Sequence, residues 1–261
     1  MLSPDEVVHG YIGSRALHRE FETPYFAEPE NFSGIGTLSF NATGADDLST
    51  AQRKARLRRW QEAFPSLSAR YLVLAGRHLD QETFDCAVQV KGLEILIVYQ
   101  SQINCIDAIA DASNLLGVQL KSSKAIRSYD PLSGLAKIKS IVLDNPKNIK
   151  NLNFLQKIPQ LEDFSLRHHA DKRLVLDSLL PLKSLNYLQR VELMGDFHML
   201  HSGLSPLYGL SMLENARISY DFKASEYAEL RERTPSLWCG SPFDLESIAE
   251  FAAAERKVLS S

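Results

Sequence analysis

The sequence has 261 residues, of which 44% are hydrophobic, and this is enough to bury one large core or one elongated core. The 29 Lys and Arg residues nearly balance the 32 Asp and Glu residues, so the formal net charge is -3. A chain of this charge has no long-range field that attracts phosphate backbones or anionic membranes, which makes nucleic acid and membrane surfaces poor candidate partners.

The first residues lack a basic stretch followed by an apolar stretch, which is the pattern of a secretory signal. No apolar run approaches the ~20 residues that a membrane-spanning helix needs. We therefore expect a cytoplasmic protein. The sequence has three cysteines, Cys86, Cys105 and Cys239, which is an odd number, and none of them has Cys-x-x-Cys spacing. We therefore predict reduced, mostly buried thiols, and we expect neither a disulfide framework nor a zinc site.

Residues 1–34 contain scattered prolines and aromatics, and the sequence predicts no regular element for them. Residues 46–64 predict a helix, because acidic residues stand at its start and Leu57, Trp60 and Phe64 fall on one side. Pro65 ends this helix. We expect residues 1–68 to form an N-terminal segment and a helix that covers one apolar end of the fold that follows.

One short pattern then recurs along the chain: an apolar residue, two of any kind, an apolar residue, one of any kind, and an apolar residue. The copies begin at Ala69, Leu93, Leu115, Ile138, Leu161, Leu188 and Leu213, at intervals of 24, 22, 23, 23, 27 and 25 residues, with a weaker outlying copy at Ile35. Between copies, leucines stand three residues apart, as at Leu179, Leu182 and Leu185, which favours a helical or 3-10 return segment.

In each copy, the second and third anchors alternate on a short strand and point inward, and stacking of the coils aligns these strands as a parallel sheet. With this pattern, residues 69–240 resemble the leucine-rich-repeat family. The resemblance implies an α/β solenoid, a horseshoe with a parallel concave β-sheet, helical or 3-10 return segments and capping segments at both ends. The family's Asn, three residues after the last anchor, is replaced by Ser101, Ser123, Pro146, His169, Asp196 and Asp221, which indicates an irregular subclass without the Asn ladder.

Residues 241–261 predict a helix that closes the other end of the stack. Asp244 can cap its amino end, and Leu245, Ile248, Ala249 and Ala252 give it one apolar face.

The outward strand positions face the concave side and are the candidate partner-binding residues. They are Tyr71, Ile95, Ile97, Tyr99, Lys121, Asp144, Asp163, Arg167, Arg190, Glu192, Arg217 and Tyr220. The early ones, together with Val73, form an apolar and aromatic patch, and the later ones alternate in charge. Such a surface is typical of protein binding, because apolar anchors supply affinity and charges set partner choice. The alternative is that the N-terminal segment folds over the early patch and buries it.

Two other chemistries are open alternatives. A metal-dependent enzyme or metal-binding protein could use His168, His169, His198 and His201, which follow two successive strands. A nucleic-acid binder could use the basic run from Arg53 to Arg59, although charged helix faces of this kind usually form a solvated side.

No Gly-rich phosphate loop, nucleophile elbow or His-Glu-x-x-His motif occurs, so the sequence predicts no enzyme and no cofactor or metal. It predicts a non-catalytic solenoid that holds another protein on its concave face. In its small size and its lack of catalytic motifs, the chain also resembles an immunity protein. The partner would then be a toxin or enzyme that the solenoid inhibits.

Overall fold

The computed structural model describes residues 25–32, 34, 36–43, 48–122, 126–169, 173–218 and 222–234. The chain divides into two compact units, Met1–Asn148 and Ile149–Ser261. Among the residues just given, no helix has both the length and the apolar character needed to cross a membrane.

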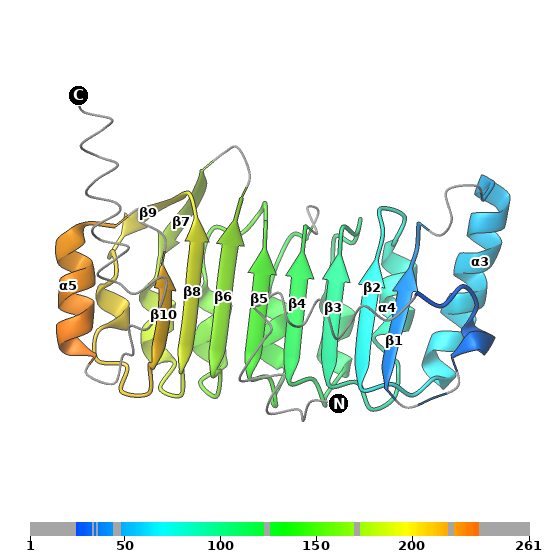
Figure 1. Ribbon diagram of the computed structural model, residues 1–261, viewed down its shortest axis with the longest axis horizontal. Coiled ribbons are helices and arrows are strands. Elements are labelled where there is room, and N and C mark those ends of the chain that lie inside the picture. The colour runs from blue at the N-terminus through cyan, green and yellow to red at the C-terminus, as the bar shows by residue number, and fades with distance from the viewer. Residues whose placement is uncertain are drawn as a thin grey trace. The chain divides into compact units, whose positions relative to one another are not determined.

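Unit Met1–Asn148 contains five parallel strands that follow one another in chain order across the sheet (Figure 1). They are β1 (Thr37–Asn41), β2 (Tyr71–Ala75), β3 (Ile95–Tyr99), β4 (Gly117–Lys121) and β5 (Ser140–Asp144). The repeat anchors lie in register, as Leu72 pairs with Leu96 and Leu74 pairs with Val98. The predicted repeats are thus confirmed, and the outlying copy upstream of Ala69 is a strand of the same sheet.

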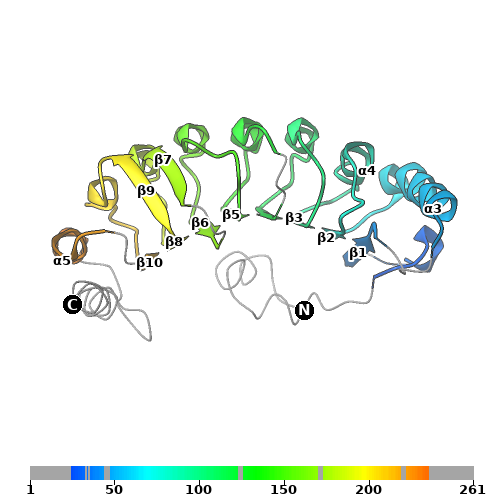
Figure 2. The same cartoon turned by 90° about the horizontal axis from the view of Figure 1, so that it is seen from above.

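The return segments of this unit lie on one side of the strands (Figure 2). They are α4 (Gln81–Ala87), η3 (Asp107–Asp111) and η4 (Asp130–Gly134), the last two being the predicted 3-10 turns. The anchors that point toward them, including Leu72, Leu96 and Ile141, are fully buried. Each such side chain contributes about 1.5–3 kcal/mol of hydrophobic stabilisation.

A left-handed residue follows each of the strands β2 to β5, and after β3, β4 and β5 it stands one residue before the position of the missing Asn. These residues are Gly76, Gln100, Ser122 and Asn145, with φ between 52° and 110°. The backbone N–H of Gln100 donates to the Lys121 carbonyl at 3.0 Å, and that of Ser122 donates to the Asp144 carbonyl at 2.8 Å. A repeated main-chain hydrogen bond therefore joins both of these turns to the last residue of the next strand.

The predicted capping helix is α3 (Thr50–Ala63), followed by η2 (Phe64–Ser66). It begins at Thr50 and not at Asp46, because Ser49 caps it: the Gln52 N–H donates to the Ser49 hydroxyl, and the Ser49 N–H donates to the Gln52 side chain. Leu57, Trp60 and Phe64 are buried, as predicted. Trp60 packs on Phe40 of β1 with ring centroids 4.9 Å apart, so the helix covers the apolar end of this unit.

In the described part of unit Ile149–Ser261, the strands of the main parallel sheet are β6 (Asp163–His168), β8 (Arg190–Gly195) and β10 (Asn215–Ile218). Its return segments are η5 (Asn153–Lys157), η6 (Leu180–Ser184) and η7 (Ser205–Leu207). Leu166 pairs with Leu193, and both are fully buried. Gly195 has φ +130°, and a Cβ there would lie 1.9 Å from the His168 carbonyl oxygen, so this close strand approach requires glycine.

Three elements of this unit were not predicted. Strands β7 (Leu174–Ser178) and β9 (Phe197–His201) pair in a separate two-stranded sheet. They occupy the extra residues of the two longest repeat intervals. Helix α5 (Ala224–Arg233) stands within the region predicted as repeats and buries Tyr227 and Leu230. The predicted closing helix in residues 241–261 lies outside the described residues.

Candidate functional site

The face of the strands turned away from the return segments, here named the strand face, carries the predicted outward positions in aligned rows. In unit Met1–Asn148, Tyr71 pairs with Ile95, and Val73 pairs with Ile97. The second of these rows continues through Gln119 to Val142, two residues that the sequence analysis did not single out. The candidate residues of these strands therefore share one face, opposite the one that carries the repeat anchors.

The early apolar patch is buried, contrary to the prediction that it is exposed. Tyr71 and Val73 are 4% exposed, and Ile95 and Ile97 are 1% exposed. They form one cluster with Val142, against which the partly buried Tyr99 also packs. Burial of this degree agrees with the alternative in which part of the chain covers the patch, because uncovered strand-face side chains would be accessible to solvent.

The last residues of β3, β4 and β5 form a row of polar side chains on the same face. Tyr99, Lys121 and Asp144 are in register. The Lys121 ammonium lies 3.7 Å from the Asp144 carboxylate and 5.9 Å from the Tyr99 ring centroid. Burial raises the pKa of Tyr99 to about 12, with a smaller contribution from Tyr25 and Asp144. The Lys121 side chain is 37% exposed, so its ammonium group is accessible to solvent.

We expect the free energy of unfolding to fall as pH rises from 10 toward 12. The unfolded chain releases a tyrosine proton near pH 10, whereas the folded chain holds it on Tyr99 up to about pH 12, so alkali favours the unfolded state. Burial likewise raises the pKa of Tyr129. Urea titrations across this pH range should show a shallower decline for Tyr99→Phe than for wild type. The exposed Tyr187 provides the control substitution, Tyr187→Phe. If Tyr187→Phe reduced the fall in the free energy of unfolding and Tyr99→Phe did not, this assignment would be contradicted.

In unit Ile149–Ser261, a cluster of charged side chains centres on Glu192 of β8. One carboxylate oxygen accepts from the Ser165 hydroxyl at 2.8 Å and from Arg167 Nε at 2.8 Å, and the other accepts from Arg217 Nη1 at 3.0 Å. The Glu192 and Arg167 side chains are only 12% and 16% exposed, whereas Arg217 is 41% exposed. One carboxylate thus holds two guanidinium groups from the flanking strands.

The strand register decides which of the candidate arginines lie side by side. Arg190 pairs with Asp163 at the start of the strands, whereas Arg167 pairs with Met194 near their end. Arg167 and Arg190 are therefore not neighbours across the strands, although they lie on successive strands of the sheet. Arg167 and Arg217 are the arginines brought together, and Ser165, which the sequence analysis missed, supports them through Glu192.

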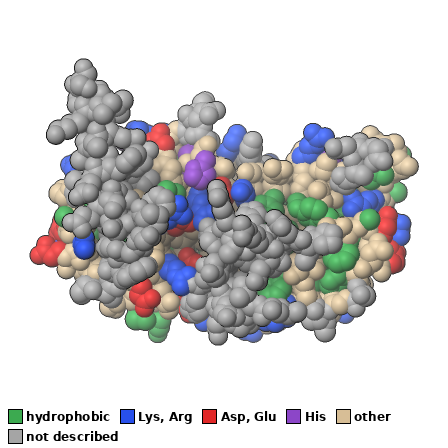
Figure 3. Space-filling model, in the orientation of Figure 1, with side chains coloured by type: hydrophobic (Ala, Val, Ile, Leu, Met, Phe, Trp, Pro, Cys, Tyr) green, Lys and Arg blue, Asp and Glu red, His purple; other side chains and the backbone are tan. Residues whose placement is uncertain are grey.

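Figure 3 shows Lys and Arg side chains gathered over β6 and β8 on this face. Arg190 is half-buried there, and its guanidinium forms no hydrogen bond or ion pair with the described residues. Tyr220, the last candidate residue, lies outside the part of the chain that the structure describes.

The histidines do not assemble a metal site in the described part of the chain. His168 is 5% exposed, whereas His169, His198 and His201 are exposed. No three His, Cys, Asp or Glu side chains with a suitable arrangement for a metal occur among the described residues. Three of these four histidines therefore face solvent.

The prediction of reduced, mostly buried thiols is confirmed only in part. Cys86 and Cys105 are free and half-buried, not fully buried, and burial is the main reason that the pKa of the Cys86 thiol is raised. A raised pKa keeps this thiol protonated and unreactive at neutral pH. Cys239 lies outside the described residues.

A cleft of about 590 Å³ beside β9 was not anticipated from the sequence. His198, His201, Lys223 and Glu226 are among its lining residues. The Glu226 carboxylate accepts from the backbone N–H groups of Leu204 and Lys223, at 3.0 and 3.1 Å. Its acidic group therefore holds the start of α5 in place.

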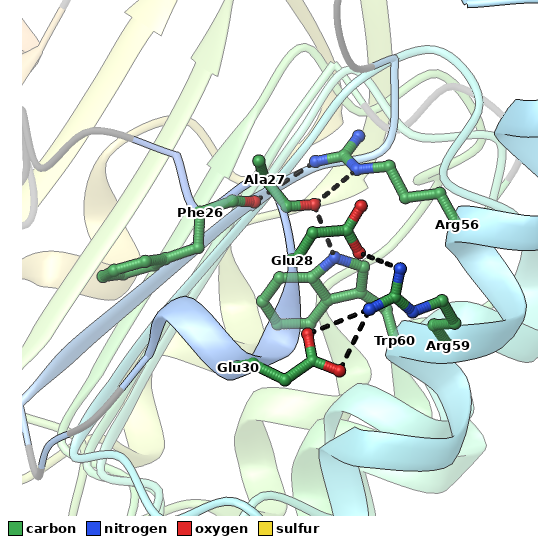
Figure 4. Close-up of polar contacts among 7 residues, drawn as sticks. All are labelled: Phe26, Ala27, Glu28, Glu30, Arg56, Arg59 and Trp60. Carbon is green, nitrogen blue, oxygen red and sulfur yellow. Dashed lines mark hydrogen bonds and ion pairs between the residues drawn. The ribbon is translucent and has the colours of Figure 1, made fainter.

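The basic run of α3 is largely used for internal contacts (Figure 4). Arg56 donates to the backbone carbonyls of Phe26, Ala27 and Asn41, at 3.2, 2.7 and 3.0 Å. Arg59 pairs with Glu28 and Glu30 at 3.1 and 3.0 Å. These arginines fasten the chain around residues 26–30 to the helix, which leaves fewer cations for a phosphate backbone.

No model of a known protein family matches the sequence, and no curated protein matches it. Among solved structures, the chain is similar to internalin C2 of Listeria monocytogenes str. 4b F2365, with a TM-score of 0.51 and 22% identity over 74% of this chain and 76% of that one. It is also similar to a chain of the mouse RP105/MD-1 complex, with a TM-score of 0.51 and 16% identity, over 78% of this chain and 38% of that one. Together with the aligned anchors and the 3-10 return segments, this likeness gives the chain the leucine-rich-repeat fold.

Proposed function

We propose that this chain is a non-catalytic protein-binding module that holds a protein partner on its strand face. The fold supports this role, because stacked repeats present an extended and rigid row of side chains to a partner. One of the similar structures is itself an assembly, the RP105/MD-1 complex. The motifs of catalysis that the sequence analysis sought are missing from the sequence.

The observation that carries the proposal is the Glu192 cluster. Arg167 and Arg217 are held by one carboxylate, so their side chains lose little conformational freedom when a partner binds. Arg190 adds a further cation on the same strand as Glu192. An acidic patch on a partner protein is the chemistry that complements this surface.

The remaining candidate residues have different parts in the proposal. Lys121 and the partly buried Tyr99 are accessible in the row that ends at Asp144. The three buried residues Tyr71, Ile95 and Ile97 would have to be uncovered before a partner could touch them. Asp163 and Tyr220 complete the set of predicted contacts.

A module of this kind can act simply by occupying the functional surface of its partner. Inhibition of a toxin or an enzyme in the cytoplasm, as an immunity protein does, is the finer form of the proposal. This form requires that the captured partner loses its activity in the stoichiometric complex. Fractionation of the native cells tests whether the chain is located in the cytoplasm.

Quantitative affinity capture from native lysate tests the proposal, with wild type, Arg190→Glu and Lys183→Glu compared in parallel. Lys183 is an exposed cation of η6, on the return-segment side, so its reversal makes the same change of charge away from the strand face. We expect one protein at stoichiometric yield with wild type and Lys183→Glu, and at least about a tenfold loss with Arg190→Glu. Equal recovery with both variants would contradict a strand-face contact.

A further inference from the structure

The cleft beside β9 lies between two elements of unit Ile149–Ser261. One wall is the unbroken stretch from Phe197 to Gly203, which contains all of β9. The other wall includes Lys223 and Glu226 at the start of α5. In both ribbon views, β9 lies on the side of β7 that faces α5 (Figure 1, Figure 2). With a volume of about 590 Å³, the cleft is within the size range of ligand sites.

In the described part of the chain, β9 is an edge strand, because it pairs only with β7. The Leu174 N–H donates to the Asp196 carbonyl at 2.9 Å, and Leu176 then pairs with Met199. Successive residues of a strand direct their N–H and C=O groups to opposite edges, so these groups face β7 at His198 and face away from it at Met199. The main-chain groups of Met199 form no hydrogen bond with the described residues.

The other edge of this small sheet is partly occupied, in contrast to that of β9. The Asp177 N–H on β7 donates to the Lys150 carbonyl at 2.8 Å. Unpaired strand edges are usually protected from further pairing by Lys, Pro or a bulge. The sequence of β9 is Phe-His-Met-Leu-His, with neither Lys nor Pro. The outer edge of β9 therefore keeps a donor and an acceptor with which another strand can pair.

The two walls of the cleft are held together by Glu226. Its carboxylate accepts from the backbone N–H of Leu204, just after β9, and from that of Lys223, just before α5. A Cβ at Gly203 would lie 1.6 Å from the Glu226 carboxylate, so this close approach requires glycine. A cleft whose walls are fixed in this way needs little rearrangement when a ligand binds.

The charges along the cleft favour an acidic ligand. Arg173, His198, His201 and Lys223 stand against Glu226 as the lone carboxylate among the described lining residues. Arg173 is paired with Asp196 at 2.6 Å, and Glu226 is used by the main chain. The exposed Lys223 ammonium forms no hydrogen bond or ion pair with the described residues. Lys223 is thus the cation available to a carboxylate that enters the cleft.

We propose that the cleft binds an extended, acidic segment of a partner protein, which pairs with the outer edge of β9 as a third strand and places a carboxylate beside Lys223. The five residues of β9 span about 16 Å at about 3.3 Å per residue, so a segment of similar length fills the edge. This site goes beyond the proposed function and does not depend on it, because β9 is not a strand of the sheet that carries the strand face.

Selection from a displayed library of random heptapeptides tests the site, with the full-length wild type, Met199→Pro and Met199→Ala as targets. Proline removes the N–H at Met199, and an edge strand tolerates it where that N–H is not part of the ladder. Alanine removes the same side chain but keeps the N–H, so it is the matched control. A thermal melt checks that each variant is folded.

We expect wild type and Met199→Ala to enrich peptides with β-branched residues and at least one Asp or Glu, and Met199→Pro to bind these peptides at least about tenfold more weakly. The most enriched peptide should lose at least about tenfold in affinity when alternate amides are N-methylated, and also with Lys223→Glu, but not with the charge control Lys183→Glu. The N-methylated peptides and Lys223→Glu test the site even where Met199→Pro fails to fold.

Enrichment of the same peptides at equal affinity on folded Met199→Pro would overturn the proposal, and so would the enrichment of none on wild type. Peptides that tolerate N-methylation but are lost with Lys223→Glu would replace strand pairing with a simple anion site, which also overturns it. Arg190→Glu on the strand face should bind the peptides as wild type does, so this result stands apart from the test of the proposed function.

Discussion

Leu166→Ala will lower the free energy of unfolding by about 2–5 kcal/mol, because it removes a fully buried side chain from the repeat core and leaves a cavity. Leu166 is the last anchor of its repeat, on β6, and pairs with Leu193 on β8. Urea unfolding followed by circular dichroism measures the loss. Because each coil contacts its neighbours, hydrogen exchange should also accelerate in β8.

The matched control for this substitution is Leu180→Ala in η6, where the leucine is 55% exposed. Its loss should be within about 0.5 kcal/mol, as for most surface substitutions. Equal losses for the two leucines, or an unchanged midpoint for Leu166→Ala, would mean that the proposed repeat register is wrong.

Glu192→Gln will lower the free energy of unfolding by about 3 kcal/mol. The substitution keeps the shape of the side chain but removes the charge that Arg167 and Arg217 share, and with it the ion pair between Glu192 and the 16%-exposed Arg167. Loss of one partner of a buried pair costs about 3–5 kcal/mol, and the exposure of Arg217 moves the expected value to the lower end. Denaturant titration at low and high salt measures the effect.

Glu214→Gln removes an exposed carboxylate just before β10 and serves as the control, with an expected change below about 0.5 kcal/mol. If the two substitutions had the same effect, Glu192 would be an ordinary surface charge and the preorganised arginine pair would have no energetic basis.

The repeat architecture could be predicted because it depends on local spacing. The anchors recur at nearly constant intervals, and those at Leu72, Leu96 and Leu166 are fully buried and in register. The extra strands β7 and β9 left a signal in the two longest intervals, but length alone does not distinguish a strand from a loop. Among the described side chains of helix α5, Tyr227 and Leu230 are the buried ones, which is too short an apolar pattern to identify the helix.

Alternation along a strand was sufficient to find the outward residues, but their partners and their burial were not predictable in this way. Arg167 pairs with Met194 because the anchors Leu166 and Leu193 are aligned, so its partner follows from the register between repeats and not from alternation within one strand. Likewise, Ile97 is outward in its strand and still 1% exposed, because burial depends on what covers the face. The link between Ser165 and Glu192 follows from the same tertiary register.

The location of the partner on the charged strand face is tested most directly by calorimetric titration of the captured partner. Arg190→Glu/Arg217→Glu reverses two accessible cations of the strand face, and Lys157→Glu/Lys183→Glu reverses two exposed cations of the return segments η5 and η6. Thermal melts show whether each variant remains folded. We predict that the arginine pair weakens binding by several kcal/mol, on the order of 100-fold or more in Kd, and that the lysine pair binds as wild type does. Normal binding by the arginine variant with loss of binding by the lysine variant would contradict the account and move the binding surface to the return-segment side.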